Sequence, residues 1–214
     1  MRGWLVPLAL AATLGAILVP RTARAEDDWQ VKRNPFDRRT IARYKALLGK
    51  NPGDTSALRN LIDLYTRHSS LAKLVAEYER QLADGAPNYA NALVLGHLRR
   101  HQGEFDLALA AYEQAATADP SAAAPHQAQG EILRRQNKPS AAALAYRAAL
   151  DRSTTGRRPL LEVLADLVTM QGDLAAAVRY RRESLAHAPN DVGARLALAE
   201  ALSQAKLHAE AIIE

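Results

Sequence analysis

The sequence contains no cysteine among its 214 residues, so disulfide bonds and cysteine-based metal sites are excluded. Aromatic residues make up only 5% of the chain. Valine, isoleucine and threonine together number 24, against 44 alanines and 31 leucines. Because β-branched residues favour strands whereas alanine and leucine favour helices, this balance predicts an all-α fold.

Sequence motifs of common catalytic sites are also absent. Gly49 and Lys50 lack the glycine that a phosphate-binding loop requires five residues earlier, and neither G-x-G-x-x-G nor H-E-x-x-H occurs. His97 and His101 have the spacing of a metal-binding pair on one helix face, but two arginines lie between them and no third ligand is near in the sequence. We therefore predict no catalytic residue, no metal site and no cofactor.

The first 25 residues have the pattern of a secretory signal peptide. Arg2 supplies a positive charge, an apolar run extends from Trp4 to Val19, and Ala23-Arg24-Ala25 offers small residues at a cleavage site. Sixteen residues fall short of the roughly twenty that span a membrane, although an uncleaved anchor is the alternative. We predict cleavage after Ala25, no membrane span in the mature chain, and a periplasmic or secreted location.

Cleavage would also change the charge of the protein. Residues 1–25 hold three arginines and no acid, so their removal lowers the formal net charge from +5 to +2. Nucleic-acid binding depends on many phosphate contacts from basic side chains. A nearly neutral mature chain therefore argues against a nucleic-acid partner.

A regular period organises the chain after residue 36. Tyr44, Tyr78, Tyr112, Tyr146 and Tyr180 recur at a constant interval and account for five of the seven tyrosines. Alanines occur four residues before three of these tyrosines, and leucines four residues after three of them. A fixed period of this length, about 34 residues, is typical of a repeat array.

The stretch from Tyr89 to Pro120 shows what one unit contains. Its spacing predicts a first helix before Gly103 and a second helix after it, ending at Asp119-Pro120 because a residue before proline avoids the α region. The small residues Gly96 and Ala108 would allow the two helices to approach closely.

In this unit the chain resembles the tetratricopeptide repeat family, most clearly in residues 102–120, which read QGEFDLALAAYEQAATADP. The resemblance implies an α-solenoid, a right-handed superhelix of helix-turn-helix repeats. The repeat positions assigned on this basis are Tyr44, Tyr78, Gly96, Ala108, Tyr112, Ala115, Pro120, Gly130, Ala142, Tyr146, Ala149, Ala177, Tyr180 and Pro189.

The predicted organisation follows the repeats. A signal peptide (1–25) and a polar lead-in (26–36) precede an array (37–214), which consists of a lone helix (37–54), repeats 55–88, 89–122, 123–157 and 158–191, and an incomplete repeat (192–214). Ile62 and Gln81 replace small residues in the repeat 55–88, which predicts looser packing there. Tyr180 is one residue out of phase with Pro189, which predicts a one-residue insertion near Arg157. Since the last repeat is incomplete, we also expect a fragment of a longer protein as an alternative to a self-contained chain.

The first helices of such repeats line the inner surface of the superhelix and bind extended peptides or partner helices in this family. Carrying over the family's positions gives a set of residues that we call the predicted groove: Arg59, Asp63, His97, Arg100, Gln127, Glu131, Arg134, Glu162 and Asp166. Helix-dipole stabilisation alone would also explain the arginines at the ends of these helices.

The resemblance thus implies a non-catalytic scaffold of the bacterial cell envelope that binds a partner protein or peptide, with its oligomeric state left open. The alternative is the N-terminal scaffold of a larger envelope enzyme, secretion protein or polysaccharide-export protein that continues beyond residue 214.

Overall fold

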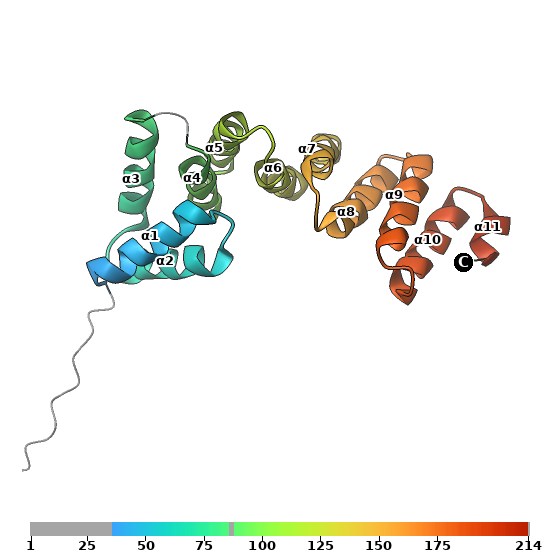
Figure 1. Ribbon diagram of the computed structural model, residues 1–214. Coiled ribbons are helices and arrows are strands. Elements are labelled where there is room, and N and C mark those ends of the chain that lie inside the picture. The colour runs from blue at the N-terminus through green and yellow to red at the C-terminus, as the bar shows by residue number, and fades with distance from the viewer. Residues whose placement is uncertain (1–35, 86–87, 214) are drawn as a thin grey trace, which may run out of the picture. The chain divides into compact units, whose positions relative to one another are not determined.

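A computed structural model describes residues 36–85 and 88–213 of the chain, and these fold into helices without any strand (Figure 1). The predicted signal peptide and all of the predicted lead-in except Phe36 lie outside the described residues. The helices are α1 (Arg38–Lys50), α2 (Thr55–His68), α3 (Leu71–Ala83), α4 (Tyr89–His101), α5 (Phe105–Ala118), α6 (Ala124–Arg135), α7 (Pro139–Arg152), α8 (Arg157–Met170), α9 (Leu174–His187), α10 (Val192–Gln204) and α11 (His208–Ile213).

Each helix from α4 onward packs mainly on the helices next to it in the chain. The pairs α4 with α5, α6 with α7, and α8 with α9 form hairpins, and each hairpin also contacts the next one. Helices that bury their apolar faces only against neighbouring repeats form a solenoid. The predicted all-α solenoid is confirmed.

The turns inside the hairpins share one backbone conformation. Gly103, Asn137, Gly172 and Lys206 each follow the first helix of a pair and have positive φ angles, of 79°, 55°, 80° and 63°. Gly103 and Gly172 can be recognised in the sequence as turn residues, but Asn137 and Lys206 at the equivalent positions cannot, because they are not glycines. A left-handed residue at this place ends the first helix and reverses the chain direction.

Four of the periodic tyrosines are buried in the hydrophobic core: Tyr78, Tyr112, Tyr146 and Tyr180. Tyr44 is half-buried and packs against the group of buried residues that includes Leu48, Leu61 and Leu74. In two repeats the tyrosine ring lies directly over a glycine of the first helix. A Cβ atom added to Gly96 would lie 2.3 Å from Cε1 of Tyr112.

The same arrangement recurs at Gly130, where an added Cβ atom would lie 2.7 Å from Cδ2 of Tyr146. Alanines of the second helices, Ala108, Ala115, Ala142, Ala149 and Ala177, are buried beside these rings. Pro120 and Pro189 are exposed just beyond the second helices. These contacts explain why only small residues stand at the glycine and alanine positions.

The period lengthens by one position at α8. The side chains of His97 and Tyr112 bond across 15 positions of the chain, and those of Asp166 and Arg181 also bond across 15. Arg181, rather than Tyr180, therefore occupies the place of Tyr112. One inserted residue rotates a helix by about 100°, so Tyr180 enters the core from the neighbouring position.

The first repeat is packed differently from the others. Ile62 and Tyr78 occupy the repeat positions that Gly96 and Tyr112 occupy in the next unit. Ile62 is buried and leaves no room for a ring in the place that Tyr112 takes over Gly96. Helices α2 and α3 make few contacts with each other, while α1 packs on both α2 and α4.

Four of the described helices start at a side-chain cap, which is an aspartate in three of them and an asparagine in the fourth. The side chains of Asp54, Asn88, Asp173 and Asp191 accept hydrogen bonds from backbone N–H groups at the starts of α2, α4, α9 and α10. Asp37 directly precedes α1, but its side chain makes no such bond. Ser70, at the start of α3, makes none either.

Candidate functional site

The predicted groove residues lie on the first helices of four successive repeats. Arg59 and Asp63 are on α2, His97 and Arg100 on α4, Gln127, Glu131 and Arg134 on α6, and Glu162 and Asp166 on α8. Arg59, Asp63, Gln127, Arg134 and Asp166 are exposed, and the other four are half-buried. Side-chain contacts connect most of them to a neighbouring helix.

His97 is held against the second helix of its own repeat. Its Nδ1 atom lies 2.9 Å from the hydroxyl oxygen of Tyr112, and the two rings meet edge to face. Burial lowers the pKa of His97 to about 4, and the positive charge of Arg100 acts in the same direction. His97 is therefore neutral near pH 7, and it contributes a hydrogen-bonding surface rather than a charge.

Arg100 links two repeats. Its guanidinium group forms an ion pair with Glu131 on α6, and the amide of Gln127 donates to the same carboxylate at 3.5 Å. Burial raises the pKa of Tyr146, and the charge of Glu131 adds to this, while Arg134 and Arg100 oppose it. The tyrosine, the acid and both arginines thus form one polar cluster on α4, α6 and α7.

Arg134 is the cation of this cluster that stays open to solvent. It is exposed, and no ion pair joins it to another residue in the described part of the chain. A charged side chain that keeps its hydration in the free protein is suited to meet a ligand group of opposite charge.

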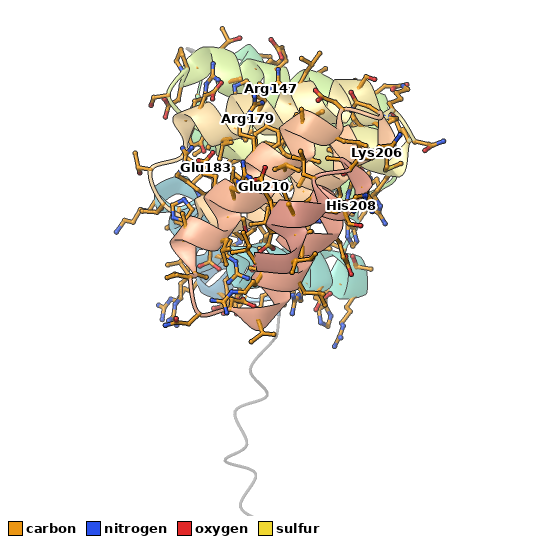
Figure 2. The ribbon with its side chains drawn as sticks, turned by 90° about the vertical axis from the view of Figure 1, so that its right-hand side faces the viewer. Arg147, Arg179, Glu183, Lys206, His208 and Glu210 are labelled. Carbon is orange, nitrogen blue, oxygen red and sulfur yellow. The ribbon has the colours of Figure 1, made fainter. Side chains whose placement is uncertain are left out.

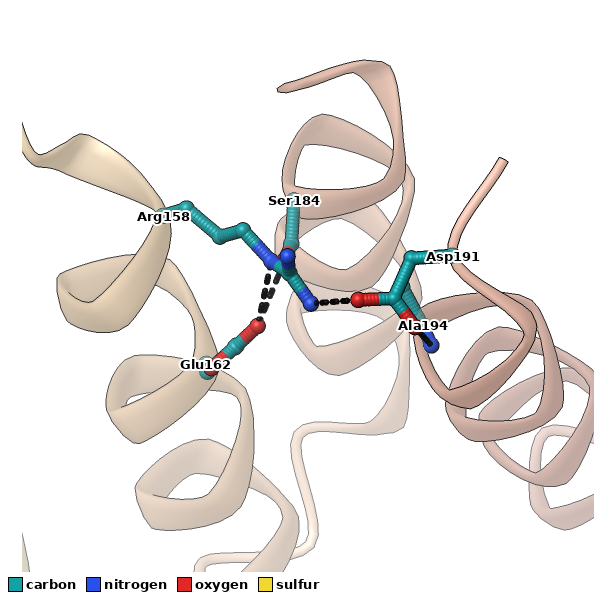
Figure 3. A network of polar contacts seen from close by, with 5 residues as sticks. All are labelled: Arg158, Glu162, Ser184, Asp191 and Ala194. Atoms are coloured by element: carbon teal, nitrogen blue, oxygen red, sulfur yellow. Dashed lines mark hydrogen bonds and ion pairs between the residues drawn. The ribbon is translucent and has the colours of Figure 1, made fainter. Parts of the chain in front are cut away.

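Glu162 belongs to a network at the junction of the last repeats, which Figure 3 shows from close by. Arg158 donates to Glu162 at 2.8 Å and also forms an ion pair with Asp191 at the start of α10. The hydroxyl of Ser184 donates to Glu162 at 3.4 Å. The backbone N–H of Ala194 and the Arg158 guanidinium lower the pKa of Asp191.

Asp166 pairs with Arg181 of α9 at 2.5 Å, in the place where Tyr112 meets His97. Both acids predicted on α8 are thus neutralised within the protein. The charges that the sequence assigned to a ligand here serve first to join α8 to α9 and α10.

Arg59 and Asp63 stand apart from this arrangement. Both are exposed on α2, and no hydrogen bond or ion pair joins either to another described residue. Helix α1 packs against α4. Among the described residues, no ion pair joins α2 to α4 in the way that Arg100 and Glu131 join α4 to α6. Side-chain contacts connect predicted groove residues of α4 with those of α6, whereas those of α8 are linked to α9 and, through Arg158, to Asp191 before α10.

Sequence reasoning missed Arg158, Arg181 and Ser184. The signal for the last two was the lengthened period, because they follow Tyr146 and Ala149 by one position more than the regular interval. Ser184 is buried at 2% exposure, where the two preceding repeats have Ala149 and Ala115. The pair of Arg158 with Glu162 has the i, i+4 spacing of one helix face, whereas Asp191 lies 33 positions away, and the pairing with it depends on the packed helices.

The part of the chain that the structure describes contains neither a cluster of metal ligands nor a membrane-spanning helix. Residues 36–85 and 88–213 contain no group of three potential ligands placed to hold a metal ion. His101 is exposed, whereas His97 is half-buried and its Nδ1 atom lies beside the hydroxyl of Tyr112. None of the described helices combines the length and apolarity that crossing a membrane requires.

Comparison with known proteins agrees with this architecture. The sequence model of the tetratricopeptide repeat matches residues 93–157, from the middle of α4 to the start of α8. A search of curated protein sequences found no match.

Solved structures share the fold at low sequence identity. A structure of MamA is 17% identical with a TM-score of 0.56, over 70% of this chain and 87% of that chain. BtubC from P. vanneervenii is 17% identical with a TM-score of 0.57, over 82% and 84%. YrrB, described as a tetratricopeptide repeat protein with an unusual peptide-binding site, is 15% identical with a TM-score of 0.55, over 78% and 86%.

The glycine and tyrosine contacts, the repeated turns and the match to the repeat model agree with one another. Residues 93–157 therefore contain tetratricopeptide repeats, and the described chain has the fold of tetratricopeptide repeat proteins.

Proposed function

We propose that this protein is a non-catalytic scaffold that binds a partner protein or peptide on the first-helix face from α4 to α8. The observation that carries the proposal is the polar cluster of Arg100, Gln127, Glu131 and Arg134, which spans two repeats and keeps Arg134 open to solvent. Solenoids use extended surfaces of this kind for binding.

The chemistry of the cluster supports binding rather than catalysis. Arg100 and Glu131 are paired with each other, and His97 is hydrogen-bonded to the hydroxyl of Tyr112. A catalytic nucleophile is activated by an adjacent base or by a lowered pKa, whereas burial lowers the pKa of His97, which makes it a weak base, and raises the pKa of Tyr112. We infer that the alternating acids and bases recognise a polar segment of another protein.

We further propose that the protein is exported and binds its partner in the cell envelope. Support comes from the sequence of residues 1–25, whose basic start, apolar run and small residues before position 26 match a secretory signal. The test is the intact mass of protein recovered from native cells together with protease protection in spheroplasts. Loss of residues 1–25 and digestion from outside are expected, whereas full mass and protection would refute export.

The binding surface is tested by capture from native cells. Full chain carrying Arg134→Glu should lose partners that the unmodified chain retains, because the change reverses the open charge of the cluster. Arg147→Glu on α7 is the matched control, since Arg147 is exposed on a second helix (Figure 2). Identical partner lists for all three proteins would remove the assignment of this face.

A further inference from the structure

Unpaired charge is unevenly distributed over the first helices α4, α6 and α8. These helices hold three acidic residues, and each forms an ion pair: Glu131, Glu162 and Asp166. Four of their six arginines are paired as well, namely Arg99, Arg100, Arg157 and Arg158. Arg134 and Arg135 at the end of α6 are exposed and form no ion pair with a described residue. The charge that this face offers to a ligand is therefore positive.

Arg134 and Arg135 share one side of α6 with two other polar residues. Gln127, Glu131, Arg134 and Arg135 have the spacing i, i+4, i+7 and i+8, which is the pattern of a single helix face. The helix dipole favours arginines in the last turn, but it leaves their charge open to a ligand. The two guanidinium groups thus extend the polar cluster of Arg100 and Glu131 along α6.

The repeat explains why Arg134 has no acidic partner within the protein. One repeat earlier, Arg100 forms its ion pair with Glu131 of the next first helix. The position equivalent to Glu131 on α8 is that of Asp166, 35 positions later, which is one repeat plus the residue inserted at α8. Arg181 of α9 already pairs with Asp166 at 2.5 Å. The insertion that brings Arg181 to this place therefore leaves Arg134 without the acid that Arg100 has.

We propose that the first-helix face binds an acidic segment of the partner protein, in which a glutamate or aspartate side chain pairs with Arg134 as Glu131 pairs with Arg100. This inference rests on the proposed function, because it names the chemistry of the partner bound there. Arginine matches a carboxylate in a fixed fork geometry, so the ligand supplies the group that the chain itself supplies one repeat earlier. Arg135 offers a second positive charge to a neighbouring acid of the segment.

The other groups of this face favour a protein segment over other anions. Nucleic-acid binding depends on many phosphate contacts, whereas α4, α6 and α8 offer two unpaired guanidinium groups. His97 is neutral near pH 7 because burial lowers its pKa, and Gln127 carries an exposed amide. A polypeptide supplies carboxylates for Arg134 and Arg135 and also backbone groups that hydrogen-bond with neutral side chains.

The test compares two synthetic 12-residue peptides, one with four glutamates and the other with glutamine at the same places. Both have blocked ends, so side chains supply every carboxylate. Binding to the full chain is measured by fluorescence anisotropy. The glutamate peptide should bind at least about tenfold more tightly than the glutamine peptide. Equal affinities, or no binding of either peptide, would overturn the proposal, as would equally tight binding of the glutamine peptide with a free C-terminus.

Variants locate the binding on the protein. Arg134→Gln together with Arg135→Gln should weaken binding of the glutamate peptide at least about tenfold. Arg147→Gln together with Arg179→Gln is the matched control, because these arginines are also exposed without an ion pair to a described residue, but lie on the second helices α7 and α9 (Figure 2). Circular dichroism checks that both double variants fold. An equal loss of binding in the two would overturn the location.

A further set of variants tests why Arg134 is unpaired. Arg181→Gln frees the carboxylate of Asp166, which should then compete for Arg134 and weaken binding of the glutamate peptide at least about threefold. Adding Asp166→Asn should restore the binding. Arg182→Gln frees Glu210 of α11 in the same way and is the control for the lost charge, so it should leave binding unchanged. Equal effects of Arg181→Gln and Arg182→Gln would overturn the role of the inserted residue.

Failure of this inference is distinct from failure of the first-helix surface. Loss of native partners from Arg134→Glu, together with equal binding of the glutamate and glutamine peptides, would keep the surface and overturn its preference for acids. Retention of all native partners by Arg134→Glu would count against the surface itself. A single-stranded oligonucleotide that displaces the glutamate peptide and binds more tightly would assign Arg134 and Arg135 to a phosphate ligand and overturn the proposal.

Discussion

Single atoms decide how closely the paired helices approach. The ring of Tyr112 lies where a Cβ atom of residue 96 would stand, at 2.3 Å, and the ring of Tyr146 is similarly close to residue 130. Periodicity in the sequence identified these small residues and these tyrosines. It did not reveal that the glycine and the tyrosine ring are in contact, because a sequence period shows which residues share a helix face but not which atoms of the neighbouring helix they meet.

We predict that Gly96→Ala destabilises the protein by about 1–3 kcal/mol, because the added methyl group forces the tyrosine ring out of its place. Gly49→Ala is the matched control. An added Cβ atom at Gly49, in α1, has no atom within 4 Å, so only the better helix propensity of alanine acts there. Urea unfolding measures both, and equal midpoints would contradict the proposed contact.

His97 makes stability depend on pH in a stated direction. Its pKa is about 4 in the folded protein against an ordinary 6.5, so the unfolded chain binds more protons between these values. The stability from His97 is complete above pH 6.5 and is lost as the pH falls toward 4, by up to about 3 kcal/mol.

His97→Gln keeps a hydrogen-bonding group beside Tyr112 and should flatten this dependence. Part of the slope will remain, because burial, followed by the charge of Arg152, also lowers the pKa of His126. His101→Gln on the exposed face of α4 is the control. Unfolding free energies measured from pH 4 to pH 7 with parallel slopes for all three proteins would rule out the role of His97.

At the scale of helices, boundaries depend on local side-chain chemistry that only partly follows the repeat. The repeats 89–122 and 123–157 each contain one helical hairpin, and α8 begins at Arg157, one residue before the predicted boundary at 158. The helix ends could be placed from proline and glycine. Asp54 and Asn88 are one repeat interval apart, but Ala122 stands at the next such position, so the sequence shows no continuous series of capping residues.

Helix α9 should depend on its cap. Asp173 accepts a hydrogen bond from the backbone N–H of Ala176 at 3.0 Å, so Asp173→Ala is expected to cost about 1 kcal/mol. Asp37→Ala is the control, because Asp37 occupies the corresponding place before α1 without such a bond. Thermal unfolding of the two variants gives the comparison, and an equal shift would show that the bond contributes nothing.

The loosely packed first repeat was anticipated from Ile62 and Gln81, but its consequence for the surface was not. A cleft lined by residues of α3, α4 and α5, among them Leu82, Leu95 and Leu107, results from the packing of α3 on α4 rather than on α2. The ion pair of Arg99 with Glu79 joins α4 to α3 there. These two residues are 20 positions apart, which is not the interval of the repeat. No rule of helix propensity or spacing predicts that contact.

Across the whole molecule, the buried repeat core joins the helices, and the first-helix face is the proposed binding surface. The first-helix face has a polar cluster linked across repeats by Arg100 and Glu131, and the sequence identified both residues through the family resemblance. The sequence overestimated the open charge on α8, because Glu162 and Asp166 are paired with Arg158 and Arg181. Arg158 and Glu162 pair within α8, whereas Arg181 reaches Asp166 only when α9 packs against α8.

The measurement that tests the central claim most directly is photo-crosslinking in native cells, with a photoreactive residue at Gln127 on α6 or at Arg147 on α7. Both positions are exposed, and they lie on the first and second helices of the same repeat. We predict a defined adduct with another protein from position 127 and none from position 147. Adducts from position 147 alone, or from neither position while the protein captures partners, would contradict binding on the first-helix face.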